Sequence, residues 1–160
     1  YQRPSDWSRQ LPFEPGFVAR YTRTATLTSF GDGHRWRGVV SANGGAALGT
    51  IQTAVSGGAE ATTDVAIGPV RRSDLTPRVA LTLGGGMNGV FRDEFLDGTL
   101  FRSSDRVSKR TFVGDAHAAI TIRWRQFGVT YRANRVGRQY NGQAHPTTWA
   151  TIETEWRLAR

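Results

Sequence analysis

HAAITIRWRQFGVTYRAN, residues 117–134, is the stretch that decides the fold. Its first half alternates, with Ala118, Ile120, Ile122 and Trp124 opposite His117, Thr121, Arg123 and Arg125. Its second half alternates again, with Phe127, Val129, Tyr131 and Ala133 opposite Gly128, Thr130, Arg132 and Asn134. Because a β-strand sends successive side chains to opposite faces, both halves are predicted strands. The very short link around Arg125 and Gln126 predicts a tight hairpin, and the aromatic residues beside it indicate a membrane interface.

The same alternation extends in both directions along the chain. Residues 151–158 place Ile152, Thr154, Trp156 and Leu158 opposite Thr151, Glu153, Glu155 and Arg157. Further upstream, Val79, Leu81, Leu83 and Met87 lie opposite Thr82, Gly84, Gly86 and Asn88. Weaker strands are expected at 17–27, 36–46 and 51–62, where Gly and Ala blur the pattern. Helical periodicity is absent over any useful length, so we expect about seven strands.

Composition narrows the class of protein. The 160 residues suit a single domain, yet only 38% are hydrophobic, which is low for a soluble chain with a thick apolar core. Without cysteine there are no disulfides, zinc–thiolate sites or thiol nucleophiles. No apolar run approaches the length of a transmembrane helix, and the first residues do not resemble a signal peptide.

The net charge of +8 comes almost wholly from arginine, with Lys109 the single lysine. Arginine pairs well with phosphate, so a phosphate-bearing partner is expected. The arginines are spread along the chain and do not form a basic helix or tail, so we expect no nucleic-acid partner.

The polar faces favour a membrane barrel over a soluble sandwich. They carry charges of both signs that could pair across a lumen: Arg20, Arg37, Glu60, Arg123, Arg132, Glu153, Glu155 and Arg157. Long polar segments at 92–110 and 135–147 contrast with the short hairpin turn, as outer loops contrast with periplasmic turns. We therefore predict an all-β protein, an antiparallel transmembrane β-barrel. An odd strand count and the missing export signal predict that residues 1–160 are a single barrel domain truncated at its N-terminus.

Three segments resemble one family. FRDEFLDGTLFRSSDRVSKRTFVGDAHAAITIRW (91–124) contains a Phe-Leu-Asp-Gly loop and a Val-Gly-Asp strand start similar to those of the outer-membrane lipid A deacylases typified by LpxR. FGVTYRANRVGRQYNGQ (127–143) resembles that family's penultimate strand and following loop, and SDWSRQLPFEPGF (5–17) resembles an earlier segment. The three occur in the family's order and together span nearly the whole chain.

The resemblance implies a twelve-stranded barrel of which this chain is the latter part. It also implies a calcium-dependent hydrolase that removes the 3'-linked acyloxyacyl group of lipid A in the bacterial outer membrane. The family's catalytic Asn-Asp pair, Ser or Thr, His and Glu lie upstream of the matched segments. No residue of this chain therefore inherits a catalytic role, the calcium ligands are expected outside it, and its own enzymatic activity is left open.

Candidate binding residues lie in the first long loop. Arg102, Arg106, Lys109 and Arg110 could bind lipid A phosphates, within lipopolysaccharide and the other lipids of the outer membrane. Asp93, Glu94 and Asp97 could bind a hard cation, although a solvated turn explains them better.

The three histidines are interpreted as structural. His34 is expected in a periplasmic turn, His145 in a loop, and His117 in the lumen near Asp115, in a network with a neighbouring Arg or Glu. Two alternatives to the deacylase stay open: a non-catalytic outer-membrane barrel module, and a soluble β-domain that binds polyanions.

Overall fold

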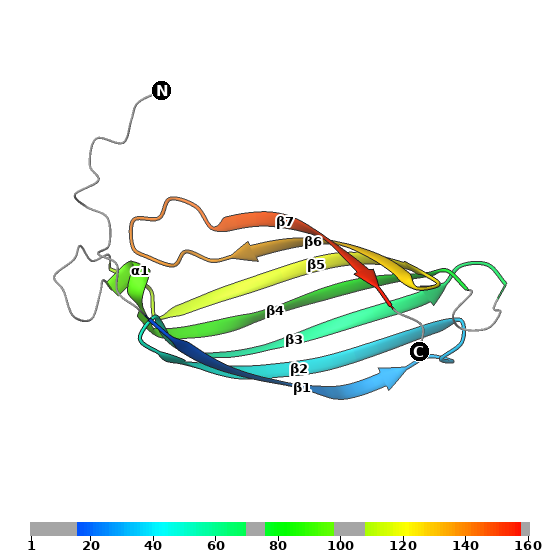
Figure 1. The fold of residues 1–160 in the computed structure, drawn as a ribbon, viewed down its shortest axis with the longest axis horizontal. Helices are drawn as coiled ribbons and strands as arrows, with labels where there is room; N and C mark the ends of the chain where they lie inside the picture. Colours follow the sequence, from blue (N-terminus) through cyan, green and yellow to red (C-terminus); the bar gives the residue numbers. More distant parts are fainter. Residues whose placement is uncertain (1–15, 70–75, 98–107, 158–160) are drawn as a thin grey trace, which may run out of the picture.

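The computed structural model describes residues 16–69, 76–97 and 108–157, which form one antiparallel sheet of seven strands (Figure 1). In order across the sheet these are β1 (Val18–Phe30), β2 (Trp36–Gly49), β3 (Gln52–Ala66), β4 (Arg78–Asp93), β5 (Phe112–Trp124), β6 (Phe127–Val136) and β7 (Thr147–Trp156). A single-turn helix, α1 (Glu94–Asp97), follows β4. The all-β antiparallel prediction is confirmed, and the described residues contain seven strands, as expected.

The strands run up and down between two ends of the sheet. The turn end carries the connections 31–35, 67–77 and 125–126 and the last residue of β7. The loop end carries the connections 50–51, 94–111 and 137–146 and the first residue of β1. The predicted hairpin at Arg125 and Gln126 is confirmed, and Arg125 adopts a left-handed φ of 53° there.

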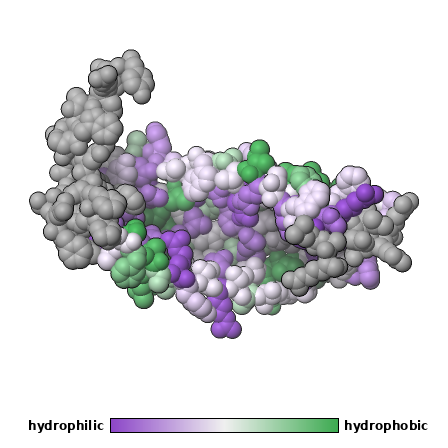
Figure 2. All heavy atoms as spheres, viewed as in Figure 1, coloured by the Kyte–Doolittle hydropathy of each residue, from purple (hydrophilic) through white to green (hydrophobic). Residues whose placement is uncertain are grey.

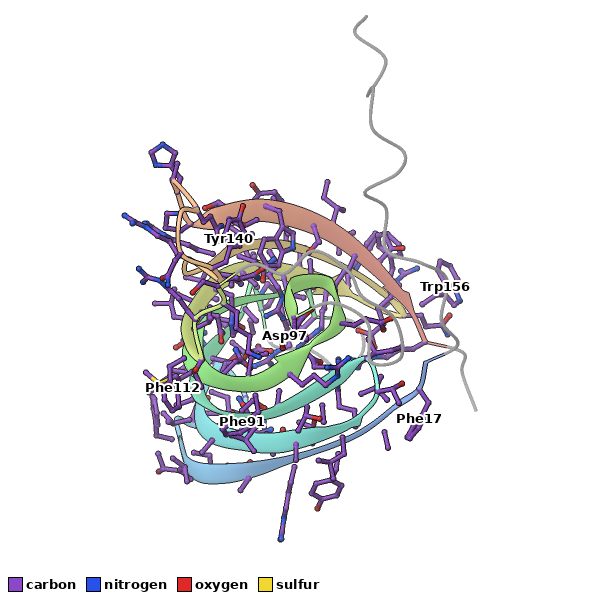
Figure 3. The ribbon with its side chains drawn as sticks, turned by 90° about the vertical axis from the view of Figure 1, so that its left-hand side faces the viewer. Phe17, Phe91, Asp97, Phe112, Tyr140 and Trp156 are labelled. Atoms are coloured by element: carbon purple, nitrogen blue, oxygen red, sulfur yellow. The ribbon has the colours of Figure 1, made fainter. Side chains whose placement is uncertain are left out.

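The curl of the sheet gives it a concave inner face and a convex outer face (Figure 3). The pairing of residues between neighbouring strands shows which side chains lie on which face. One row across the sheet runs Glu60, Gly84, His117, and the adjacent row runs Ala61, Leu83, Ala118. The first row shares its face with the buried side chains of Ala80, Thr82, Val113, Ala119 and Thr121, so it lies inside.

The outer face exposes large apolar side chains that a soluble sheet would bury. Those of Leu81, Leu83, Met87, Ile120, Ile122, Tyr131 and Ile152 are 41–73% exposed. In the space-filling view, hydrophilic side chains gather along the hollow of the sheet (Figure 2). This inside-out distribution is the one a bilayer requires, because lipid solvates the apolar side. The strands have 10–16 residues, enough for a tilted crossing of about 9–11 residues.

The connections differ from the sequence prediction. Strand β4 continues to Asp93 and β6 to Val136, so both long loops begin later than expected at 92 and 135. The strict alternation of short turns and long loops is also wrong, since β2 and β3 join through residues 50–51 at the loop end. Residues 67–77 make a longer connection at the turn end. The strand predicted at 151–158 is β7, which starts at Thr147; Leu158 lies outside the described residues.

Candidate functional site

His117 is the centre of a polar cluster in the middle of the inner face. Its Nε2 lies 2.9 Å from Glu60 Oε2, which confirms a lumen-facing histidine in contact with a neighbouring carboxylate. The two residues are on β5 and β3, so the imidazole reaches across β4. It can do so because Gly84 has no side chain: a Cβ there would lie 2.5 Å from His117 Cε1. The predicted neighbour Asp115 instead accepts a 2.8 Å hydrogen bond from Asn88 Nδ2.

A second cluster lies towards the turn end of the inner face. Asp64 accepts a hydrogen bond from Arg78 Nε and lies 3.4 Å from Arg123 Nη1. Arg78 Nη1 also donates to the backbone oxygen of His34, 3.0 Å away in the 31–35 turn. Charges of both signs therefore pair on the inner face, as the sequence predicted for a lumen. His34 serves the turn through its backbone, within a loop where Asp32 accepts three backbone N–H groups at 2.7–3.0 Å.

Aromatic residues mark the turn end of the outer face. Phe30 packs edge-on against Trp36 with ring centroids 5.7 Å apart, and Phe127 packs against Trp156 at 6.2 Å. The Arg125 guanidinium lies 5.0 Å from the centre of the Trp124 ring. Half-exposed aromatics beside cationic groups are typical of a membrane–water interface, where one part of each ring contacts lipid and the other contacts water.

The loop end is held together by Lys109 and Asp97. The Lys109 ammonium donates to Asp97 Oδ2 and to the backbone oxygen of Phe91, 2.7 Å away. Asp97 also accepts from the backbone N–H of Asp93 at 2.9 Å. These contacts hold α1 in front of the hollow of the sheet, as the view from the loop end shows (Figure 3). Burial opposes ionisation of Asp97, but the Lys109 and Asp93 hydrogen bonds and the charges of Lys109 and Arg92 outweigh it, so the Asp97 pKa lies below its usual value.

The four predicted phosphate-binding residues have different positions. Arg102 and Arg106 lie outside the described residues. Lys109 is turned towards α1 and Phe91. Arg110 is exposed and lines a cavity at the loop end, and its guanidinium makes no hydrogen bond or ion pair with the other described residues. Phosphate binding by this group stays a prediction, with Arg110 as its most available described member.

The acidic residues of this loop do not offer a calcium site. In the described parts of the chain, no group of three or more His, Cys, Asp or Glu side chains is arranged to hold a metal ion. Asp97 already accepts from a lysine and from a backbone amide. The third histidine, His145, is exposed in the 137–146 connection, where its backbone oxygen accepts from Gln143.

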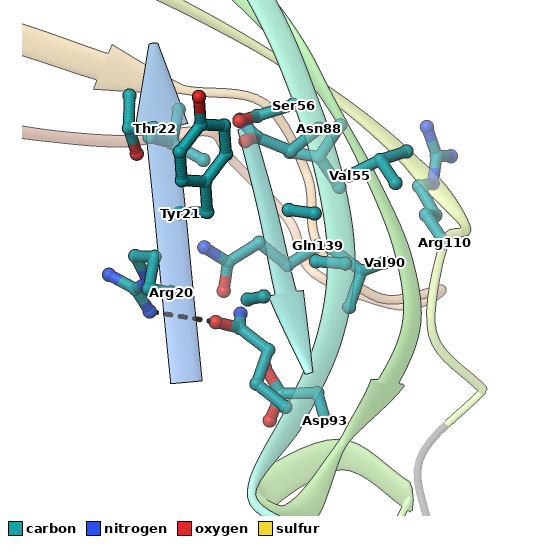
Figure 4. A pocket seen from close by; sticks show the side chains of 16 residues that line it. Arg20, Tyr21, Thr22, Val55, Ser56, Asn88, Val90, Asp93, Arg110 and Gln139 are labelled. Carbon is teal, nitrogen blue, oxygen red and sulfur yellow. Dashed lines mark hydrogen bonds between the residues drawn. The ribbon is translucent and has the colours of Figure 1, made fainter. Parts of the chain in front are cut away.

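A cavity of about 330 Å³ at the loop end was not foreseen from the sequence. Its walls include Arg20 on β1, Gln52 on β3, Asn88 on β4 and Gln139 beyond β6 (Figure 4). Arg20 Nη2 donates to Gln52 Oε1 at 2.9 Å. These residues are far apart in the sequence, and only the register and curl of the sheet bring them together.

None of the described helices is long and apolar enough to cross a membrane.

The family model for the outer membrane protein LpxR matches residues 1–158. Among solved structures, LpxR from Salmonella typhimurium has a similar fold, with a TM-score of 0.74 at 15% identity. The similarity covers 94% of this chain and 55% of the Salmonella chain, so this chain spans about half the length of that relative. No curated protein matches the sequence.

Proposed function

This chain belongs to the LpxR family of outer membrane proteins, and from that premise we propose that the protein is a calcium-dependent lipid A 3'-O-deacylase. Its location is the outer membrane. The observation that carries the proposal is the family membership itself. In the proposed enzyme this chain supplies the latter part of the barrel wall, and its loop end faces the lipopolysaccharide of the outer leaflet.

The two ends of the sheet support this orientation. The long connections 94–111 and 137–146 lie at the loop end and the two-residue turn 125–126 lies at the turn end, as bacterial barrels have longer extracellular loops and short periplasmic turns. The loop end then faces outside and presents Arg110 two residues before Phe112, whose side chain is 65% exposed. A cationic group next to an exposed aromatic ring matches the chemistry of lipid A, which joins phosphates to acyl chains.

Hydrolysis itself is assigned to residues outside this chain. The described residues contain no calcium site, so no step of the reaction is derived through the metal from them. Their proposed role is to hold the barrel wall in the bilayer and to bind the phosphorylated sugar of the substrate.

Mass spectrometry of lipid A tests the activity. Cells that carry the full-length gene and grow with calcium should contain lipid A lacking its 3'-linked acyloxyacyl group. Cells with an empty vector serve as the control. Unchanged lipid A acylation would contradict the proposal and would favour a non-catalytic barrel.

The Arg110→Gln variant tests the phosphate contact. We expect about a fivefold to tenfold higher KM for lipid A with kcat unchanged, because a charge-assisted hydrogen bond at an exposed site contributes about 1 kcal/mol. The matched control is Arg35→Gln, which removes an exposed arginine at the turn end. Equal effects of the two substitutions on KM would contradict a specific contact at Arg110.

A further inference from the structure

The loop end of the inner face contains a cavity whose size and lining suit a bound ligand. Its volume of about 330 Å³ is near the lower limit for ligand pockets, which have volumes of about 300–1,000 Å³. A cavity of this size suits a small molecule. The mouth of a β-barrel is also a common place for such pockets. We propose that this cavity binds a soluble sugar of about monosaccharide size.

The polar walls carry the chemistry that sugar hydroxyls need. Gln52, Asn88 and Gln139 each place a donor and an acceptor side by side, and Ser56 adds a hydroxyl. Each sugar hydroxyl is likewise both a donor and an acceptor. Figure 4 shows the Gln139 side chain extending into the cavity from the segment after β6. Amides and hydroxyls in this number favour a polyol over a hydrocarbon or a simple ion.

The remaining walls suit a sugar ring. Val90, Val113 and Val136 line the cavity from β4, β5 and the end of β6. Their methyl groups can pack against the C–H face of a sugar ring. Three charged residues also line the cavity: Arg20 and Arg110 are positive, and Asp93 is negative. Their side chains can donate hydrogen bonds to sugar hydroxyls or accept hydrogen bonds from them.

The inner face below the cavity is occupied by polar side chains that interact with one another. The next rows towards the turn end hold the paired side chains of Asn88 with Asp115, at 2.8 Å, and of His117 with Glu60, at 2.9 Å. Beyond them, Asp64 pairs with two arginines. Asn88 belongs to both groups, because its amide lines the cavity and also donates to Asp115. The side chains below it pair with one another. A sugar would therefore bind at the loop end, where the polar lining is available.

Saturation-transfer NMR on the protein purified from outer membranes tests the proposal. The detergent must be lauryldimethylamine oxide, because alkyl glycosides would compete for the site. D-glucose, D-galactose and D-mannose serve as probes, and at least one should receive saturation at millimolar concentration. Gln139→Leu should weaken that binding at least tenfold, since it removes a polar contact at nearly constant size. Gln126→Leu, the same change in the β5–β6 turn, should bind normally.

Three results would overturn the proposal: no transfer to any of the three sugars, equal binding by the Gln139→Leu protein, or transfer only to the sugars of added lipopolysaccharide. The last result would assign the cavity to a glycolipid and not to a soluble ligand. None of these results depends on lipid A deacylation, so the sugar site and the proposed enzymatic function can fail separately.

Discussion

Replacement of Gly84 by alanine should destabilise the sheet through His117. An alanine Cβ would lie 2.5 Å from His117 Cε1 and 2.6 Å from Nε2, well inside contact distance. The imidazole must therefore move and lose its 2.9 Å contact with Glu60. Overpacking costs about 1–3 kcal/mol and a lost hydrogen bond about 0.5–1.5 kcal/mol. Alanine also lowers the conformational entropy of the unfolded chain, which stabilises the folded protein by about 0.4–1 kcal/mol. We expect a net loss of about 1–3 kcal/mol.

Guanidinium unfolding of the protein in lipid vesicles, followed by the fluorescence of its five tryptophans, measures this loss. Gly57→Ala is the matched control, because the nearest atom to a Cβ there is 4.0 Å away. The decisive comparison repeats Gly84→Ala in a His117→Ala background, where the clash is gone and the penalty should largely disappear. A penalty of the same size in both backgrounds would refute the reasoning, since the cost would then come from the β4 backbone.

Two further predictions concern the outer face and the loop end. Leu83 is 66% exposed on the outer face, so Leu83→Arg should place a charge in lipid and destabilise the protein by about 2–4 kcal/mol near the bilayer midplane. The same substitution on a surface that faces water would change stability by about 0.5 kcal/mol or less. Vesicle unfolding measures it, and a neutral result would contradict lipid contact. The lowered Asp97 pKa means that its link to Lys109 stabilises α1 above the ordinary aspartate pKa and is lost as pH falls through the lower folded value. The hydrogen-exchange protection factors of residues 93–97, which are corrected for the intrinsic slowing of exchange in acid, should therefore fall at acid pH in the native protein. In an Asp97→Asn protein these protection factors should not change with pH.

Much of the fold could be predicted where side chains alternate without interruption. Residues 117–134 placed their two strands and the Arg125 turn correctly, because apolar and polar groups occupy strictly alternating positions. Glycine-rich strands gave weaker predictions. In β2 and β4, Gly44, Gly45 and Gly84 have no side chain and therefore interrupt the alternation of apolar and polar residues. The strands predicted there were shorter than the observed strands β2 and β4.

The candidate site was predicted only in part. His117 was correctly placed in the lumen, but its partner Glu60 is 57 positions away in the sequence. That pairing depends on the register of two intervening ladders and on the gap left by Gly84. Lys109 was grouped with the exposed arginines from its position in a polar loop, yet it is turned towards Asp97 and the Phe91 carbonyl.

Sequence alone determined the two-faced strands, the tight hairpin and the family resemblance. These features depend on the period of side chains along a strand and on short local motifs, which are properties of neighbouring residues. Tertiary structure decided which polar groups meet on the inner face, and it placed Arg20 and Gln139 around one cavity. Such contacts depend on strand register and sheet curl, since a one-residue slip would send every one of these side chains to the opposite face.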